Sequence, residues 1–268
     1  MTTLAARAEA ELNEIIARYA AGEAEVVRAY FAQPRTAAEH ADLVRRQMGR
    51  EVFLLDWLDD AARGAPDLER GVERHAFVAL LEQIADETRH YAALADLAEW
   101  LLGRPLTHEE AFEYKVHAMF SPTQPAERQH NPRLPEANAM LNLLRRYHDQ
   151  YGTYAEDVRR MTEGGGGGSF LQASQLSGDP FRERFAAAMG RIATDELDHG
   201  VRHVHAFVGQ HVRTDDDLAR AARVMREYMA QHLRVRNEIY GNPIGPERLA
   251  AIDRGEIDAW AIPAAAPA

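Results

Sequence analysis

Two short stretches of the sequence repeat one arrangement of ionisable residues. The stretch Asp86–His90 reads DETRH and the stretch Asp195–His199 reads DELDH, so a glutamate precedes a histidine by three positions in each. Residues three positions apart lie on the same face of a helix. Each Glu-x-x-His pair therefore directs a carboxylate and an imidazole to one point, and these oxygen and nitrogen ligands suit a divalent transition metal.

Apolar residues surround both pairs at helical spacing. The residues that share a face with Glu87 are Leu80, Ile84, Tyr91 and Leu94, and those that share a face with Glu196 are Phe185, Met189, Ile192, Ala193 and Phe207. An ionised carboxylate on an apolar stripe is costly unless it is paired or bound to a metal. The pattern therefore predicts two buried metal-binding pairs, Glu87 with His90 and Glu196 with His199.

A dinuclear carboxylate site also needs one acid from each of two further helices. In the segment 37–62, Glu51 interrupts an apolar face to which Val44 and Met48 belong. The aspartates on the opposite side, which are expected to face solvent, are Asp56, Asp59 and Asp60. Glu51 is therefore the predicted acid of this segment.

Two glutamates of the segment 135–168 are candidates for the remaining acid. Glu156 and Glu163 share a helix face, and Glu163 lies at a depth similar to that of Glu196 in an antiparallel helix pair. We therefore choose Glu163 as the ligand and keep Glu156 as the alternative.

The apolar residues on the two sides of Glu163 do not share one helix face. Those of the stretch 140–158 point away from Glu163, whereas those of 166–173 point with it. A rotation by one residue, about 100°, would reconcile the two halves. A π-bulge supplies such a rotation, so we predict one between 155 and 168. An unbroken α-helix there would favour Glu156, or no acid from this segment.

A run of consecutive glycines, Gly164–Gly168, follows Glu163 directly. A flexible linker is the usual interpretation of such a run. Inside a bundle helix, however, missing side chains would leave space beside the metals for a substrate or for O2. We favour this second interpretation, in which Gly166, Gly167 and Phe170 line a substrate pocket.

The elements that must position these residues are helices throughout the chain. Ala, Leu, Glu and Arg dominate, and the alternation of β-branched residues that is typical of strands is absent. The predicted helices are 3–32, 37–62, 67–102, 135–168, 180–211 and 214–240. The stretch 104–133 is predicted to be a long connection with one helical turn near 109–117.

Two antiparallel helix pairs joined by one long crossover predict an all-α fold, a ferritin-like four-helix bundle. The short turns within the pairs are 63–67 and 175–179. We expect a single domain over 1–240 that has the metal-binding bundle at about 37–211 and additional N- and C-terminal helices, followed by an irregular C-terminal arm, 241–268. A generic up-and-down bundle that contains a long loop is the alternative.

The composition excludes several classes of protein. The net charge of −11 disfavours nucleic-acid binding, which needs a concentrated basic face. The absence of cysteine excludes disulfides, thiolate metal sites and iron–sulfur clusters. No run reaches the roughly 18 apolar residues of a membrane span, and the first residues lack the pattern of a secretory signal. We therefore expect a cytoplasmic protein that binds neither nucleic acid nor membrane.

With these acids and Glu-x-x-His pairs in this order, the chain resembles the ferritin-like diiron-carboxylate superfamily over about 37–211, and it looks most like the bacterial diiron oxygenases. Members of the superfamily include the ribonucleotide reductase small subunit, methane monooxygenase-type hydroxylases, acyl carrier protein desaturases and ring-epoxidising acyl-CoA oxygenases. The resemblance implies that two iron ions bind the residues Glu51, Glu87, His90, Glu163, Glu196 and His199. A manganese–iron pair suits the same ligands.

Three further residues lie beside these ligands. The resemblance implies that Asp86 and Asp195 are outer-shell partners, each of which orients a ligating histidine of the opposite helix. His203 lies on the same face as Glu196 and His199 and departs from the superfamily's pattern. It is an additional ligand, an outer-shell group or a core histidine, and the sequence leaves these roles open.

The activity that the resemblance implies is that of a non-haem diiron monooxygenase or oxidase. Such an enzyme activates O2 to hydroxylate, epoxidise or N-oxygenate a small organic or acyl-thioester substrate. Electrons would come from a separate reductase, from the substrate or from peroxide, and we expect a homo-oligomer, a dimer. Iron storage or peroxide detoxification, as in ferritins and rubrerythrins, is the alternative, and a metal-free partner subunit is a third. The sequence identifies neither the substrate nor the reaction outcome.

Overall fold

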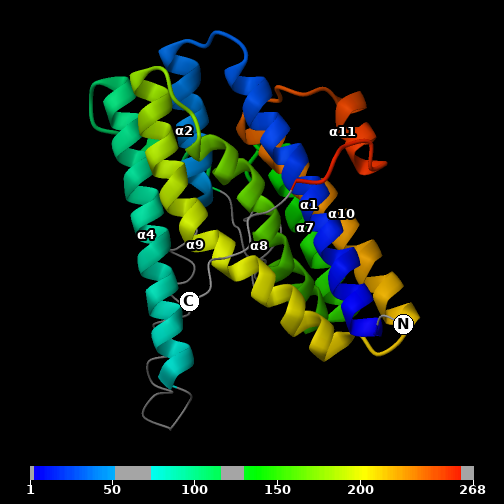
Figure 1. Ribbon diagram of the computed structural model, residues 1–268. Coiled ribbons are helices and arrows are strands. Elements are labelled where there is room, and N and C mark those ends of the chain that lie inside the picture. The colour runs from blue at the N-terminus through cyan, green and yellow to red at the C-terminus, as the bar shows by residue number, and fades with distance from the viewer. Residues whose placement is uncertain (1–2, 52–73, 116–129, 261–268) are drawn as a thin grey trace. The chain divides into compact units, whose positions relative to one another are not determined.

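The computed structural model describes residues 3–51, 74–115 and 130–260, and all regular structure in these ranges is helical (Figure 1). The helices are α1 (Leu4–Phe31), α2 (Ala37–Glu51), α4 (Arg74–Leu102), α5 (His108–Phe112), α7 (Pro135–Tyr151), α8 (Thr153–Ser174), α9 (Pro180–His211), α10 (Asp215–Ile239) and α11 (Pro246–Asp253). The predicted all-α fold is confirmed for these residues. None of the described helices is both long and apolar enough to cross a membrane. The predicted helical stretches 52–62 and 67–73 lie outside the described residues.

Contacts between residues divide the chain into two compact units. Unit 1 comprises residues 1–34 and 142–268, and unit 2 comprises residues 35–141. Helix α7 begins in unit 2 and continues in unit 1. The ferritin-like arrangement and the single domain over 1–240 therefore stay predictions, and the two units are described separately below.

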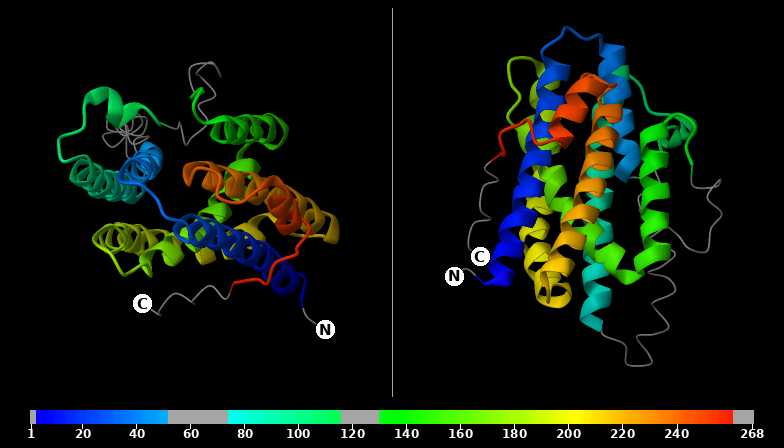
Figure 2. Two further views of the ribbon diagram at one scale, coloured as in Figure 1. Left: turned by 90° about the horizontal axis from the view of Figure 1, so that it is seen from above. Right: turned by 90° about the vertical axis from the view of Figure 1, so that its right-hand side faces the viewer.

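Unit 1 contains a bundle of α1, α8, α9 and α10. The most extensive interface joins α8 to α9, and α1 packs against α8, α9 and α10 (Figures 1 and 2). Helix α1 buries a stripe at helical spacing that includes Leu12, Ile16 and Tyr19. The first and last long helices, which the sequence placed outside the bundle at 37–211, thus belong to the core of this unit.

Side-chain caps begin two of these helices at the predicted residues. Asp179 accepts hydrogen bonds from backbone N–H groups of the first turn of α9, and Pro180 occupies the first helical position. Thr214 and Asp217 form a capping box at the start of α10. The predicted starts of both helices are confirmed.

The predicted fourth helix is divided at Gly152. This residue has φ 60° and ψ −135°, which ends α7 at Tyr151 and lets α8 begin at Thr153. Glycine adopts a positive φ readily because it has no Cβ. From Thr153 to Ser174 the backbone is α-helical without interruption. The predicted π-bulge between 155 and 168 is therefore wrong, because the helix changes phase at the glycine that precedes α8.

The glycine run Gly164–Gly168 lies inside α8, so the flexible-linker interpretation is also wrong. A Cβ atom built on Gly168 would lie 2.2 Å from the backbone oxygen of Ala20 in α1. Glycine at this position therefore lets the backbones of α8 and α1 approach closely. At least one residue of the run serves helix packing rather than open space.

The predicted irregular arm 241–268 contains a helix, α11. Gly245 lies at its N-cap and Pro246 at its first position, where a missing N–H costs nothing. Leu249 and Ile252 of α11 are buried, and the helix packs against α1 and α10. This short amphipathic stretch was missed because its two core residues are a weak periodic signal.

Candidate metal centre

In unit 2 the helices α2 and α4 pack against each other. Helix α2 buries Val44, Gln47, Met48 and Glu51, which recur at helical spacing on one face. On α4 the residues around Glu87 that the sequence placed on an apolar stripe include Ile84 and Leu94, and both are buried. The helix faces that carry the predicted ligands of this unit are thus the packed faces.

The structure brings three predicted ligands of unit 2 together. Glu51, Glu87 and His90 are 6%, 7% and 3% exposed. The Nδ1 atom of His90 lies 3.3 Å from Oε2 of Glu87 and 3.8 Å from Oε2 of Glu51. One donor atom from each residue lies within 4.8 Å of the others. We call this group the Glu–Glu–His cluster.

Burial and charge make the Glu–Glu–His cluster unfavourable with both carboxylates ionised. The pKa of Glu51 is raised to about 8, first by burial and then by the negative charge of Glu87 and a hydrogen bond with it. The charges of His90 and Arg50 act in the opposite direction and are smaller causes. Two carboxylates that share a buried site cannot both ionise readily unless a cation joins them. In the protein without metal, a proton replaces that cation.

The geometry of the cluster fits a divalent ion. At metal–ligand distances of about 2.0–2.2 Å, as for zinc, ligand atoms around one ion lie about 3–4.4 Å apart. The two separations measured from Nδ1 of His90, 3.3 and 3.8 Å, lie in this range. Two carboxylates and an imidazole form the ligand set preferred by iron, manganese or zinc rather than by calcium or copper(I).

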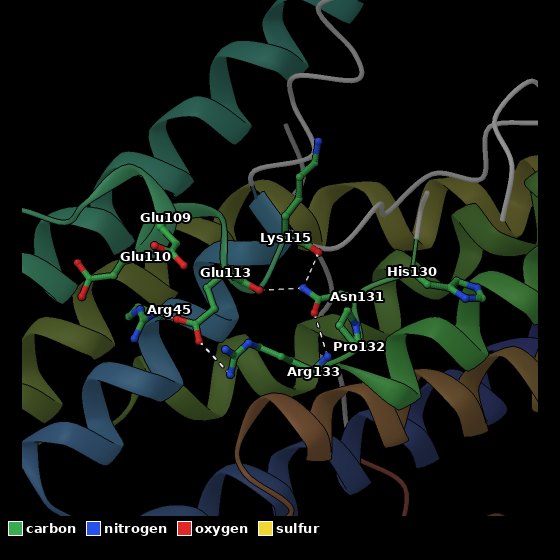
Figure 3. A pocket seen from close by; sticks show the side chains of 9 residues that line it. All are labelled: Arg45, Glu109, Glu110, Glu113, Lys115, His130, Asn131, Pro132 and Arg133. Atoms are coloured by element: carbon green, nitrogen blue, oxygen red, sulfur yellow. Dashed lines mark hydrogen bonds and ion pairs between the residues drawn. The ribbon is translucent and has the colours of Figure 1, made fainter. Parts of the chain in front are cut away.

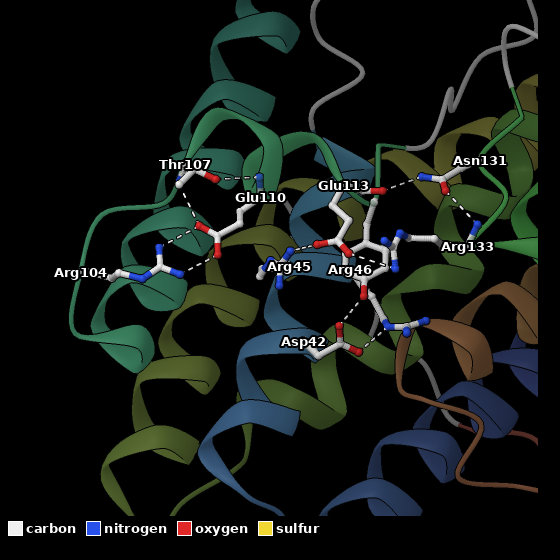
Figure 4. A network of polar contacts seen from close by, with 10 residues as sticks. Asp42, Arg45, Arg46, Arg104, Thr107, Glu110, Glu113, Asn131 and Arg133 are labelled. Carbon is white, nitrogen blue, oxygen red and sulfur yellow. Dashed lines mark hydrogen bonds and ion pairs between the residues drawn. The ribbon is translucent and has the colours of Figure 1, made fainter.

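Helix α2 is held against the residues that follow α5 by a polar network to which Asp42 and Arg46 belong (Figure 4). The Tyr114 hydroxyl donates to Asp42, and the Arg46 guanidinium lies 4.7 Å from the centre of the tyrosine ring. A Cβ atom on Gly49 would lie 2.0 Å from the backbone oxygen of Tyr114, so only glycine permits this approach. The contact holds α2 in place two residues before Glu51.

An open pocket of about 580 Å³ lies beside this network in unit 2 (Figure 3). The residues that line it are Arg45, Glu109, Glu110, Glu113, Lys115, His130, Asn131, Pro132 and Arg133. Glu113 pairs with Arg45 and, at 3.2 Å, with Arg133. Acidic and basic groups thus neutralise each other in this pocket, unlike in the Glu–Glu–His cluster.

The predicted ligands of unit 1 lie on α8 and α9, which pack against each other. The side chains of Glu163, Glu196, His199 and Asp195 lie outside the described part of the structure, and so does the burial of Gly166. Their roles stay predictions. The apolar stripe of α9 is confirmed, because Phe185, Met189, Ile192, Ala193 and Phe207 are buried.

The unbroken α8 reopens the choice between Glu156 and Glu163. Glu156 accepts a hydrogen bond of 3.0 Å from Nε of Arg159, which occupies one of its oxygens. Gly167 and Phe170, four and seven residues after Glu163, are buried, so the face to which Glu163 belongs is buried further along α8. Because Glu156 shares this face, the burial does not distinguish the two glutamates. The unbroken α-helix favours Glu156, or no acid from this segment, over the predicted Glu163.

The remaining candidates have other contacts. Asp86 pairs with Arg89 one turn along α4, and His203 is half-buried. The guanidinium carbon of Arg236 lies over the ring of Phe170, 4.8 Å from the centre of that ring. Nothing in these contacts tests the outer-shell or pocket roles predicted for these residues.

Sequence reasoning missed a second buried Glu–His pair, in unit 1. Nδ1 of His232 in α10 lies 2.6 Å from Oε1 of Glu23 in α1, and Nε of Arg236 lies 3.4 Å from Oε2 of the same glutamate. We call this group the Glu–His–Arg cluster. The residues of α1 and α10 are far apart in sequence, and α1 contains five glutamates, so the sequence did not single out Glu23.

Comparisons with known proteins identify no relative. No protein-family model, no curated protein and no solved structure matches this chain. The function must therefore be argued from the cluster and from the pattern of the sequence.

Proposed function

We propose that this chain is a dinuclear iron oxidase or oxygenase that uses O2 to oxidise a small organic or acyl-thioester substrate. The observation that carries the proposal is the buried Glu–Glu–His cluster of unit 2. It combines the second-helix acid and the first Glu-x-x-His pair, which are half of the ligand set that a diiron-carboxylate protein requires.

Charge is the first support for a metal at this cluster. Two carboxylates with an exposure of 6% and 7% lie beside one histidine, and burial of such charges is tolerated when a cation binds them. Since a solvated group of acids would not be surrounded by residues such as Val44, Met48 and Leu94, the cluster is more than a charged surface.

The second ion needs a second ligand set. The sequence provides Glu163, Glu196 and His199 on another pair of packed helices, in the same combination of two carboxylates and one imidazole. We propose that these residues hold it, with Glu156 as the alternative to Glu163. Bound iron would supply the redox chemistry with O2, which no side chain of the chain can supply.

The chain's own residues would orient the ions, exclude water and bind the substrate. The apolar side chains around the cluster keep bulk water from it, and the glycine-rich part of α8 with Phe170 is the proposed substrate region. Electrons would come from a separate reductase, from the substrate or from peroxide. Hydroxylation, epoxidation and N-oxygenation are all compatible with this site, as is a manganese–iron pair.

Metal analysis tests the proposal directly. Purified protein loaded anaerobically with Fe²⁺ should bind two irons per chain, and exposure to O2 should produce a visible absorption band. Hundreds of irons per oligomer would favour storage, and no bound iron would contradict the proposal. Glu87→Ala should lose iron, whereas Glu82→Ala, a change of an exposed glutamate on the same helix, should retain it.

A further inference from the structure

A buried amide contacts the Glu–Glu–His cluster. Gln47 is 1% exposed and lies one turn before Glu51 on α2. Its Nε2 group donates a hydrogen bond of 3.1 Å to Oε1 of Glu51. The other oxygen of Glu51, Oε2, lies 3.8 Å from Nδ1 of His90. Oε1 of Glu51 thus contacts the amide of Gln47, whereas Oε2 is the oxygen that lies near His90.

We propose that Gln47 is a positioning residue of the metal centre, which holds Oε1 of Glu51 so that Oε2 alone faces the ion. The inference rests on the proposed function, because it assumes that the cluster binds metal. A carboxylate can bind an ion through one oxygen or through both. A hydrogen bond to one oxygen favours the first mode, and such outer-shell partners fix the orientation of a ligand and tune its affinity.

The surroundings of Gln47 favour its contact with Glu51. Val44 and Met48, its neighbours on the buried face of α2, are both fully buried. The close approach of Gly49 to Tyr114 fixes the backbone between Gln47 and Glu51. An amide buried among apolar residues is costly without a hydrogen bond, so Gln47 gains by keeping its contact with Glu51.

A simpler role is also compatible with the same contact. Residues four apart on a helix can form a side-chain hydrogen bond that stabilises the helix alone. In that case, replacement of Gln47 would lower the stability of the protein but leave metal binding unchanged. The experiment must therefore measure the metal site as well as the fold.

The test compares Gln47→Met with a matched variant, Gln172→Met. Gln172 lies on α8, in unit 1, and accepts a hydrogen bond of 2.9 Å from Arg28. Co²⁺ is the probe, because its visible spectrum reports the number and arrangement of its ligands. Affinity is obtained by titration, and thermal unfolding without metal is recorded for each variant.

We expect Gln47→Met to bind Co²⁺ about 10–100-fold more weakly than wild type and with an altered spectrum. Gln172→Met should keep the wild-type affinity and spectrum. An unchanged affinity and spectrum in Gln47→Met, whatever its melting temperature, would overturn the inference but not the proposed function. A wild-type protein that binds no Co²⁺, Fe²⁺ or Mn²⁺ would overturn both. If Gln47→Met does not fold, Gln47→Leu replaces it in the same assays.

Discussion

The Glu–Glu–His cluster and the Glu–His–Arg cluster, both within the described residues, differ in one group. In unit 2 a histidine lies between two glutamates, 3.3 and 3.8 Å from Glu87 and Glu51. In unit 1 a histidine lies 2.6 Å from Glu23, and the third member is Arg236. Both clusters are buried, and both pair a carboxylate with Nδ1 of an imidazole. The third member of the Glu–His–Arg cluster is a cation, the guanidinium of Arg236. The third member of the Glu–Glu–His cluster is a second carboxylate.

This difference separates a structural ion pair from a metal site. Arg236 is fully buried, and its guanidinium offsets the charge of Glu23 from the next turn of the helix that carries His232. Among the described residues, this cluster contains one carboxylate and one permanent cation, so we expect the Glu–His–Arg cluster to bind no ion. The Glu–Glu–His cluster reaches neutrality by taking up protons or by binding a metal. Burial and the contact between glutamate and histidine alone would not have distinguished the two.

The largest effect is expected in unit 1. Glu23→Ala leaves the buried guanidinium of Arg236 without its carboxylate, which typically destabilises a protein by about 3–5 kcal/mol. Glu11→Ala is the control, because Glu11 pairs with Arg226 at the surface, where such pairs contribute about 0–1 kcal/mol. Urea unfolding of the metal-free proteins measures both. Similar losses for the two variants would show that the buried pair has no special role.

The next effect is the response of stability to metal. Fe²⁺ or Mn²⁺ at 100 times its dissociation constant should stabilise the wild-type protein by about 2.7 kcal/mol, since it binds the folded state alone. Glu87→Ala should lose most of this gain. A conservative change in the other cluster, Glu23→Gln, should retain it if the variant folds. Loss of the response in Glu23→Gln and not in Glu87→Ala would reverse the assignment of the two clusters.

A smaller gain is expected when the crowding of acids in unit 2 is relieved. Glu51→Gln should stabilise the metal-free protein by about 1 kcal/mol or more, because one pKa unit corresponds to about 1.4 kcal/mol. The same change should weaken metal binding, so stability and affinity should move in opposite directions. Thermal unfolding in the presence of a chelator measures the first, and metal titration the second. A destabilised Glu51→Gln protein would mean that the carboxylate is satisfied without metal.

The same crowding of acids predicts a dependence of stability on pH. The pKa of Glu51 is about 8 in the folded protein, against an ordinary 4.5, so the folded state holds this proton more tightly than the unfolded state. The stability that this proton provides is complete below pH 4.5 and is lost as the pH rises through 8. The metal-free wild type should therefore lose stability relative to Glu51→Gln over this range. Parallel pH profiles of the two proteins would contradict the shift.

Local signals predicted much of this molecule. The composition indicated an all-α chain, and the helices predicted to begin at 180 and 214 begin at Pro180 and Asp215. The Glu–Glu–His cluster was predicted because Glu51 and Glu87 interrupt apolar stripes, and a charge on a buried face is conspicuous in a sequence. These inferences use spacing within one helix, which the geometry of the α-helix fixes.

The failures concern information that no single helix contains. Gly152 lies in a helical pattern, and a glycine there is tolerated often enough that its break could not be distinguished from a continuous helix. Glu23 and His232 are 209 positions apart, so their contact depends on the packing of α1 against α10. The requirement for glycine at position 168 also depends on another helix, because the backbone of Ala20 in α1 leaves no room for a side chain there.

The tight contact between Gly49 and Tyr114 has a consequence for how relatives of this chain could be found. A homologue that keeps both this contact and the amide of Gln47 is expected to read Gln-x-Gly-x-Glu where this chain reads QMGRE (residues 47–51), ahead of a Glu-x-x-His pair. Such a five-residue signature combines a steric requirement with a chemical one. A search for this signature would find distant homologues even where the rest of the sequence has diverged.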